Sequence, residues 1–97
     1  MVDAIREYPH VALSNKLWCH MASDASDDEL HAFAAQLGIS RDRFQGDHYD
    51  LGPRQRERAV ALGAEEVPTS ELTLRMSGPR GDRARARRQR RLSAEGS

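Results

Sequence analysis

Two stretches of the chain have an apolar pattern regular enough to predict secondary structure. Leu17–Ala22 is apolar on both alternating faces apart from one histidine, which predicts a strand covered on both sides. Ser26 is expected to cap the helix that follows, with Glu29 reaching back in a capping box, and Gly38 to end it. That helix is predicted over residues 27–37 because apolar residues recur at the i, i+3, i+4, i+7 spacing of a core-facing side, namely Leu30, Phe33, Ala34 and Leu37.

The remaining elements are shorter and are separated by glycine and proline. Met1–Ile5 is compatible with an edge strand, and Glu7–Lys16 is expected to be a loop. Further along, the pattern predicts an extended piece at Asp47–Leu51, a helix from Pro53 to about Leu62, a short strand at Glu65–Val67, and a helix from Thr69 or Ser70 to Met76.

Strands and helices that alternate in this way are typical of a small α/β domain. We therefore expect residues 1–76 to form one domain with a two- to three-stranded, mostly parallel sheet and three helices. Residues 77–97 contain Gly78, Pro79 and Gly81, followed by an arginine-rich run without apolar periodicity. This composition predicts a disordered basic C-terminal tail.

Charge divides the chain at nearly the same place. Residues 1–74 hold seven basic and thirteen acidic side chains, a balance of −6, whereas residues 75–97 hold eight arginines and two acids, a balance of +6. Arginine-rich segments neutralise phosphates, so the tail predicts a nucleic acid or another acidic partner. The arginines expected to make these contacts are Arg83, Arg85, Arg87, Arg88, Arg90 and Arg91.

The rest of the composition limits the setting in which the protein works. Cys19 is the single cysteine, which excludes an internal disulfide and suits a reducing cytoplasm. No apolar run approaches the roughly 20 residues that span a bilayer, and Asp3 and Glu7 interrupt any apolar region of a signal peptide. A chain of 97 residues buries a modest share of its surface, which is compatible with a homodimer.

Histidine and aspartate are concentrated where the predicted sheet would end. Asp24 follows the first predicted strand, and His31 lies early in the next helix, at the edge where α/β proteins bind ligands. His48 and Asp50 would point the same way from an extended segment. Imidazole and carboxylate without thiolate favour an open site for Zn²⁺, Mn²⁺ or Fe. We expect the ligands to converge from His20, Asp24, His31, His48 and Asp50.

The same residues also suit acid–base chemistry without a metal. His48 or His31 would then act as the base, oriented by Asp50 or Asp24, so that the catalytic residues would be His48, Asp50 and His31. The structural alternative is a hydrogen-bonded polar cluster that pins loops to the sheet, with His20 as a core histidine. The sequence leaves these alternatives open.

Four ordered blocks of the chain resemble a small bacterial and phage family, the domain of unknown function 4031. They are L-W-C-H-M-A-S-D at 17–24, E-L-H-A-F-A at 29–34, H-Y-D-L at 48–51 and A-V-A-L-G-A at 59–64. The resemblance covers about residues 1–76, and the family's usual first strand, V-Y-V-D, is reduced here to Val2-Asp3. Some relatives look to be fused ahead of an HD-type phosphohydrolase module, which by analogy implies nucleotide or phosphoester chemistry.

Two functions follow, and the sequence does not decide whether the protein is an enzyme. The first is a domain that acts on or senses a nucleotide or phosphoester through its histidine–aspartate cluster, with a divalent metal as the expected cofactor. The second is a non-enzymatic bacterial or phage accessory module that binds a host protein or nucleic acid.

Overall fold

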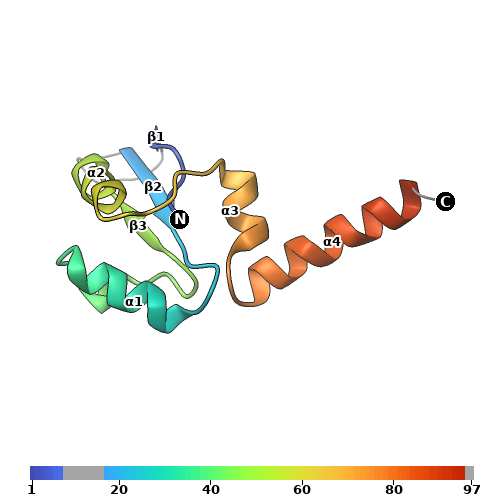
Figure 1. The fold of residues 1–97 in the computed structure, drawn as a ribbon, viewed down its shortest axis with the longest axis horizontal. Helices are drawn as coiled ribbons and strands as arrows, with labels where there is room; N and C mark the ends of the chain where they lie inside the picture. The colour runs from blue at the N-terminus through green and yellow to red at the C-terminus, as the bar shows by residue number, and fades with distance from the viewer. Residues whose placement is uncertain (8–16, 96–97) are drawn as a thin grey trace.

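The computed structural model describes residues 1–7 and 17–95, and within them it shows a three-stranded antiparallel sheet with four α-helices. Strand β2 lies in the centre, with β1 on one side and β3 on the other (Figure 1). The elements in chain order are β1 (Arg6–Glu7), β2 (Leu17–Met21), α1 (Asp27–Gln36), the short 3-10 helix η1 (Arg41–Arg43), β3 (Tyr49–Leu51), α2 (Pro53–Ala61), α3 (Thr69–Arg75) and α4 (Pro79–Glu95).

The prediction of an α/β domain is confirmed, but the prediction of a mostly parallel sheet is wrong. Both strand pairs are antiparallel. The chain passes through α1 and η1 after β2 and then turns back, as an antiparallel bridge between Phe44 and Tyr49 shows. An alternation of strands and helices does not fix strand direction when a connection contains such a reversal. The predicted strand at Glu65–Val67 forms one isolated parallel bridge, between Val2 and Glu66.

Helix α1 begins and ends close to where the sequence predicts. The Ser26 hydroxyl accepts a hydrogen bond from the Glu29 amide at 3.1 Å, which confirms the N-cap. The second half of the predicted capping box is wrong, because the Glu29 carboxylate accepts from the Ser23 hydroxyl instead. Gly38 follows the helix with φ of 73°, the left-handed conformation that favours glycine.

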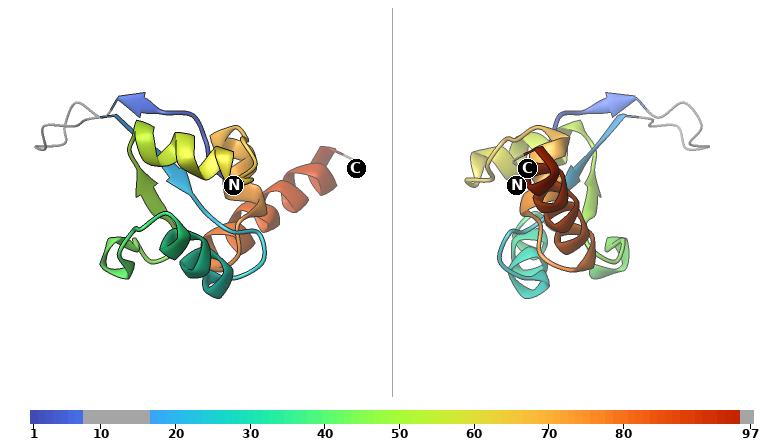
Figure 2. Two further views of the ribbon diagram at one scale, coloured as in Figure 1. Left: turned by 60° about the vertical axis from the view of Figure 1, so that its left-hand side comes forward. Right: turned by 90° about the vertical axis from the view of Figure 1, so that its right-hand side faces the viewer.

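One face of the sheet forms the main core, and the opposite face carries polar side chains. Cys19, Met21 and Leu51 are almost fully buried and pack with Leu30 and Ala34 of α1. This is the face that α1 and α2 cover (Figure 2). Because side chains alternate along a strand, His20 and Asp50 point to the other face. The fold therefore presents two polar side chains of neighbouring strands side by side.

The C-terminal residues differ most from the prediction, which has three helices and a disordered tail. Pro79–Glu95 forms a fourth helix, α4, whose first turns pack against α3 and bury Ala84. A Cβ atom placed on Gly81 would lie only 1.8 Å from the Met76 carbonyl oxygen, so this packing requires glycine. The division of the chain into a domain at 1–76 and a tail at 77–97 stays a prediction.

Two further expectations concern residues 8–16 and the membrane. Most of the loop expected at Glu7–Lys16 lies outside the described residues. Among the residues that the structure describes, none of the helices combines the length and the apolar character needed to cross a bilayer.

Candidate metal centre

Three side chains from two neighbouring strands converge on the polar face of the sheet. His20 on β2 lies directly opposite Asp50 on β3, and His48 immediately precedes β3. One ligand atom from each of these three residues lies within 4.8 Å of the other two. Two imidazoles and one carboxylate at this spacing are a donor set typical of zinc, iron and manganese sites.

A buried aspartate fixes the orientation of His20. Asp3 is 1% exposed, and its Oδ2 lies 2.7 Å from Nδ1 of His20 while its Oδ1 accepts from the His20 amide at 2.6 Å. The Thr69 hydroxyl donates to the same carboxylate at 2.8 Å. Burial by itself would raise the pKa of Asp3, but these hydrogen bonds outweigh it and lower the pKa below its usual value. With Nδ1 held by Asp3, Nε2 is the ring nitrogen of His20 that would bind an ion.

A second aspartate orients His48 in the same way. Nδ1 of His48 lies 2.6 Å from Oδ1 of Asp47, and Nε2 lies 3.3 Å from Oδ1 of Asp50. The contact with Asp50 raises the pKa of His48; Asp47 adds to this increase and burial opposes it. The same contact lowers the pKa of Asp50. Both imidazoles thus carry the carboxylate partner that metal-binding histidines typically have.

The distance between His48 Nε2 and Asp50 Oδ1 is compatible with a shared ion as well as with a direct ion pair. Charge-assisted N–H···O bonds measure about 2.7–2.9 Å, whereas these two atoms are 3.3 Å apart. Two ligands of a tetrahedral ion, each about 2.1 Å from it, are about 3.4 Å apart. The spacing in the structure therefore accommodates an ion after small side-chain adjustments.

A small pocket of about 70 Å³ adjoins the two histidines. Its walls come from β2, the segment before β3, α3 and α4, and they include His20, His48, Thr69, Thr73, Met76 and Arg80. The guanidinium of Arg80 contacts Asp47 at 3.0 Å, which links the start of α4 to the carboxylate that orients His48. A pocket with a guanidinium beside a metal-type donor set suits an anionic ligand.

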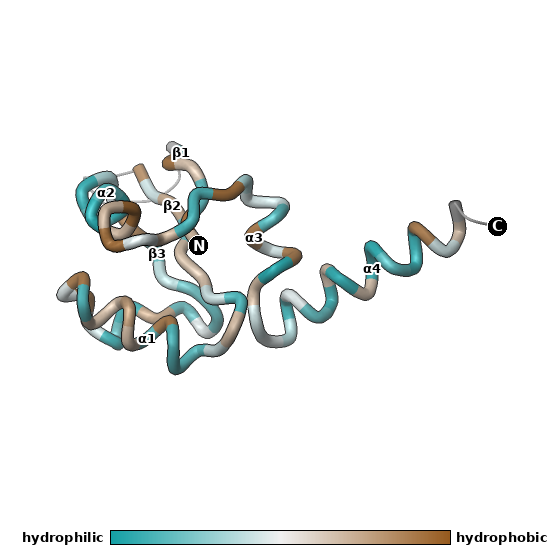
Figure 3. Tube along the Cα trace, in the orientation of Figure 1, coloured by the Kyte–Doolittle hydropathy of each residue, from teal (hydrophilic) through white to brown (hydrophobic). Residues whose placement is uncertain are grey.

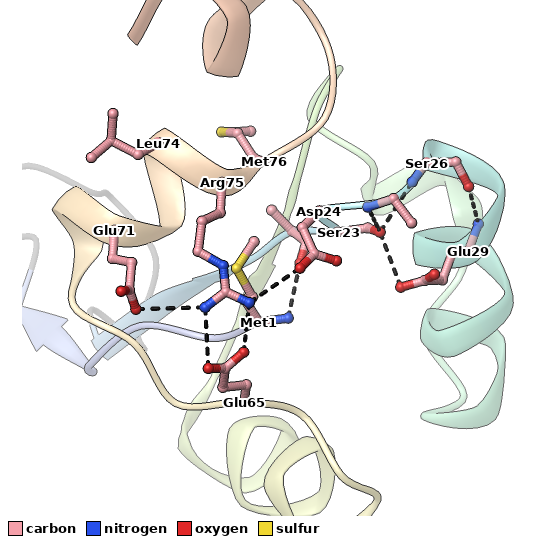
Figure 4. A network of polar contacts seen from close by, with 12 residues as sticks. Met1, Ser23, Asp24, Ser26, Glu29, Glu65, Glu71, Leu74, Arg75 and Met76 are labelled. Carbon is pink, nitrogen blue, oxygen red and sulfur yellow. Dashed lines mark hydrogen bonds and ion pairs between the residues drawn. The ribbon is translucent and has the colours of Figure 1, made fainter. Parts of the chain in front are cut away.

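Asp24 does not join this group. Its carboxylate pairs with Arg75, whose guanidinium also contacts Glu65 and Glu71 (Figure 4). The distances from Nη2 of Arg75 are 3.1 Å to Asp24 and 2.7 Å to Glu65. Asp24 thus lies in a separate ion-pair cluster that holds the segment after β2 to α3.

His31 is also placed elsewhere. Its Nδ1 lies 2.8 Å from the hydroxyl of Tyr49, and its ring packs edge-on against Phe44. Tyr49 points into the main core, on the face of the sheet opposite His20 and Asp50. The structure therefore brings together His20, His48 and Asp50 from the predicted set of five, and it separates Asp24 and His31 from them.

Sequence reasoning missed the residues that hold the histidines in place. Asp47 is adjacent to His48 in the chain, so its role was open to recognition from the sequence. Asp3 stands 17 residues before His20, and only strand pairing brings them together. The sequence predicts Thr69 or Ser70 at the start of α3 as its cap, but Pro68 occupies the cap position and the Thr69 hydroxyl donates to Asp3 instead.

Cys19 has no part in the candidate centre. It lies on the core face of β2, is 1% exposed, and burial followed by the nearby charge of Asp3 raises the pKa of its thiol to about 12. A thiol with such a pKa stays protonated near neutral pH and is a poor nucleophile.

Comparison with known proteins places the chain in a family without assigning an activity. No curated protein and no solved structure matches the chain. A family model described as "Protein of unknown function (DUF4031)" matches residues 3–78, a segment that contains the three converging residues and both orienting aspartates. Because this match covers most of the 97 residues, the chain belongs to the DUF4031 family.

Proposed function

We propose that this domain binds one divalent transition-metal ion through His20, His48 and Asp50 and uses it to act on or sense a phosphoester ligand. The observation that carries the proposal is the convergence of these three ligand atoms within 4.8 Å of one another. The carboxylates of Asp3 and Asp47 add support, because they orient both imidazoles from behind.

Three protein ligands favour a working site over a purely structural one. Structural zinc sites are usually closed by four protein ligands, whereas catalytic sites keep a position for water or substrate. An ion held here would polarise a phosphoryl oxygen or lower the pKa of a bound water. Arg80 lines the adjoining pocket, and its guanidinium, which contacts Asp47 at 3.0 Å, is a group suited to the negative charge of a phosphoester. The lone buried thiol of Cys19 is consistent with work in a reducing cytoplasm.

Metal binding by the purified chain is the first test. After metal removal, titration with Zn²⁺, Mn²⁺ and Fe²⁺ is expected to give one bound ion per chain by calorimetry, and the melting temperature should rise with the bound ion. His20→Gln and Asp50→Asn should each weaken binding strongly. Asp24→Asn and His31→Gln are matched controls that should retain it, because both lie outside the converging group.

Phosphoester chemistry is tested separately, with the metal-loaded chain. Hydrolysis of a bis(nitrophenyl) phosphate or of nucleoside phosphates, or metal-dependent binding of the latter, would support the second half of the proposal. If the chain binds stoichiometric metal but shows neither hydrolysis nor metal-dependent binding of these compounds, the metal site is supported and the phosphoester assignment is contradicted. Binding that survives loss of both His20 and Asp50 would contradict the metal site itself.

A further inference from the structure

Helix α4 leaves the body of the protein after its first turns. Arg85 donates to the carbonyl oxygens of Leu74 and Met76 at 2.8 and 3.0 Å, and Ala84 is buried, so the N-terminal part is docked on α3. From residue 85 to residue 94 every side chain is exposed. Figures 1 and 2 show the helix extending away from the sheet and the other helices. A helix of 17 residues is about 25 Å long.

Arginines form a stripe along the exposed part of α4. Arg83, Arg87, Arg90 and Arg91 follow the i, i+4, i+7, i+8 spacing that places residues on one side of a helix. Among the side chains of residues 1–6 and 17–94, no ion pair joins any of these four arginines to a carboxylate. Arg85, by contrast, lies off this side and is paired with Asp82.

The helix has no apolar side with which to bind a protein. Figure 3 shows hydrophilic positions along most of its length, and Leu92 is its single large exposed apolar residue. Protein interfaces depend on a buried apolar or aromatic centre, which this surface does not offer. Nucleic-acid interfaces depend mainly on phosphate contacts, and arginine makes these with a planar fork of donors.

We propose that α4 is a binding surface for the phosphate backbone of duplex nucleic acid, engaged through Arg83, Arg87, Arg90 and Arg91. A helix with its side chains is about 10–12 Å across and fits the DNA major groove, which is about 12 Å wide. Aromatic residues, on which the bases of single strands stack, are absent from α4, which favours a duplex over a single strand. Contacts to phosphates carry no sequence information, so this binding does not depend on base sequence. The acidic body repels phosphate and directs the duplex to the helix. This proposal does not depend on the metal centre.

Fluorescence anisotropy with the full chain and a labelled random-sequence duplex tests the proposal. Four phosphate contacts predict that log Kd changes with log salt with a slope of about 3–4, so affinity should fall roughly 100-fold between 50 and 200 mM salt. Replacing Arg83, Arg87, Arg90 and Arg91 with Gln should abolish binding at 50 mM salt. Glutamine matches arginine in helix propensity, and circular dichroism checks that the variant stays folded.

A matched control removes the same charge from the body. Arg6, Arg41, Arg43 and Arg54 are exposed, and changing these four to Gln should leave affinity and salt slope nearly unchanged. A duplex DNA arm and a duplex RNA arm distinguish the two sources of phosphate, and binding of either duplex that is lost with the four arginines of the stripe supports the proposal. Binding that survives loss of the stripe, or no binding at 50 mM salt, overturns it. So does self-association of the chain that needs the stripe and occurs without nucleic-acid binding.

Discussion

The molecule holds two carboxylate clusters, and their carboxylates are paired with different kinds of cationic side chain. In the first, Asp24, Glu65 and Glu71 surround Arg75 at the surface. In the second, Asp3 and Asp47 hold the rings of His20 and His48. A guanidinium is permanently charged and binds no metal, whereas an imidazole accepts either a proton or a metal ion.

This difference identifies which cluster can exchange its cation. The Arg75 guanidinium already lies between these carboxylates and donates hydrogen bonds to Asp24 and Glu65, so an incoming ion would have to displace this side chain. In the histidine cluster, Asp3 contacts Nδ1 of His20 and Asp47 contacts Nδ1 of His48. The Nε2 atom of each ring is thereby left on the side of Asp50. The Arg75 cluster is therefore a structural ion-pair network, and the histidine cluster is the candidate site.

The largest effect is expected from removing the buried member of the histidine cluster. Asp3→Ala would leave the His20 amide, the His20 ring and the Thr69 hydroxyl without their acceptor, and should cost about 3 kcal/mol in the free energy of unfolding. Urea denaturation measures the change. Asp24→Ala in the other cluster is the control, and its loss should be much smaller because Asp24 is exposed. Equal losses would contradict the contrast between the clusters.

A change at Asp47 should act on metal affinity more than on the fold. Asp47→Asn keeps the shape of the side chain but weakens its contact with the His48 ring, so the affinity for Zn²⁺ should fall about 10- to 100-fold. Competition with a chromogenic chelator measures this change. Asp24→Asn, the same substitution in the arginine cluster, should leave the affinity unaltered. An unchanged affinity in Asp47→Asn would contradict the role of Asp47 in orienting His48 toward the ion.

Loss of the guanidinium should produce a smaller effect that depends on salt. Arg75→Gln leaves three neighbouring carboxylates without their shared cation, so the melting temperature should fall at low salt, and the difference from wild type should shrink in 0.5 M NaCl. Scanning calorimetry at two salt concentrations tests this. Zn²⁺ affinity should be retained, and a loss of affinity would mean that the two clusters are coupled.

The smallest expected effect is the pH dependence of the stability that Glu65 contributes. The hydrogen bond from Arg75 lowers the pKa of Glu65 below its usual value, so its contribution to stability is present above the unfolded-state pKa of about 4.5 and is lost as pH falls through the lower folded-state pKa. The stability difference between wild type and Glu65→Gln should therefore shrink between pH 5 and pH 3 at low salt. A difference that stays constant over this range would contradict the pairing.

Local patterns are sufficient to predict β2, α1 and α2 but not the directions of the strands. The apolar spacing of α1, its Ser26 cap and the proline at the start of α2 are all properties of neighbouring residues, and the structure confirms them. Strand direction depends on how η1 and the residues after it reverse the chain, which no periodic pattern records. Helix α4 was missed because its sequence has no apolar side to signal it.

The candidate site shows the same limit. The sequence places His48 and Asp50 on one side of an extended segment because alternation along a strand is local, and in the structure the two side chains are 3.3 Å apart. His20 joins them through an antiparallel register that the sequence did not predict. Asp24 and His31 were grouped with them on the assumption that all strand ends meet at one edge, which holds for a parallel sheet and not for this one.

The direct opposition of His20 and Asp50 has a consequence for how the chain reaches its native state. A slip of one residue between β2 and β3 would turn one of these side chains to the other face of the sheet and separate the pair. Strands this short hold their alignment through few hydrogen bonds, so misaligned forms compete with the native one. An ion bound by His20 and Asp50 together would stabilise only the native alignment. Metal binding would therefore shift the population from misaligned forms to the native one.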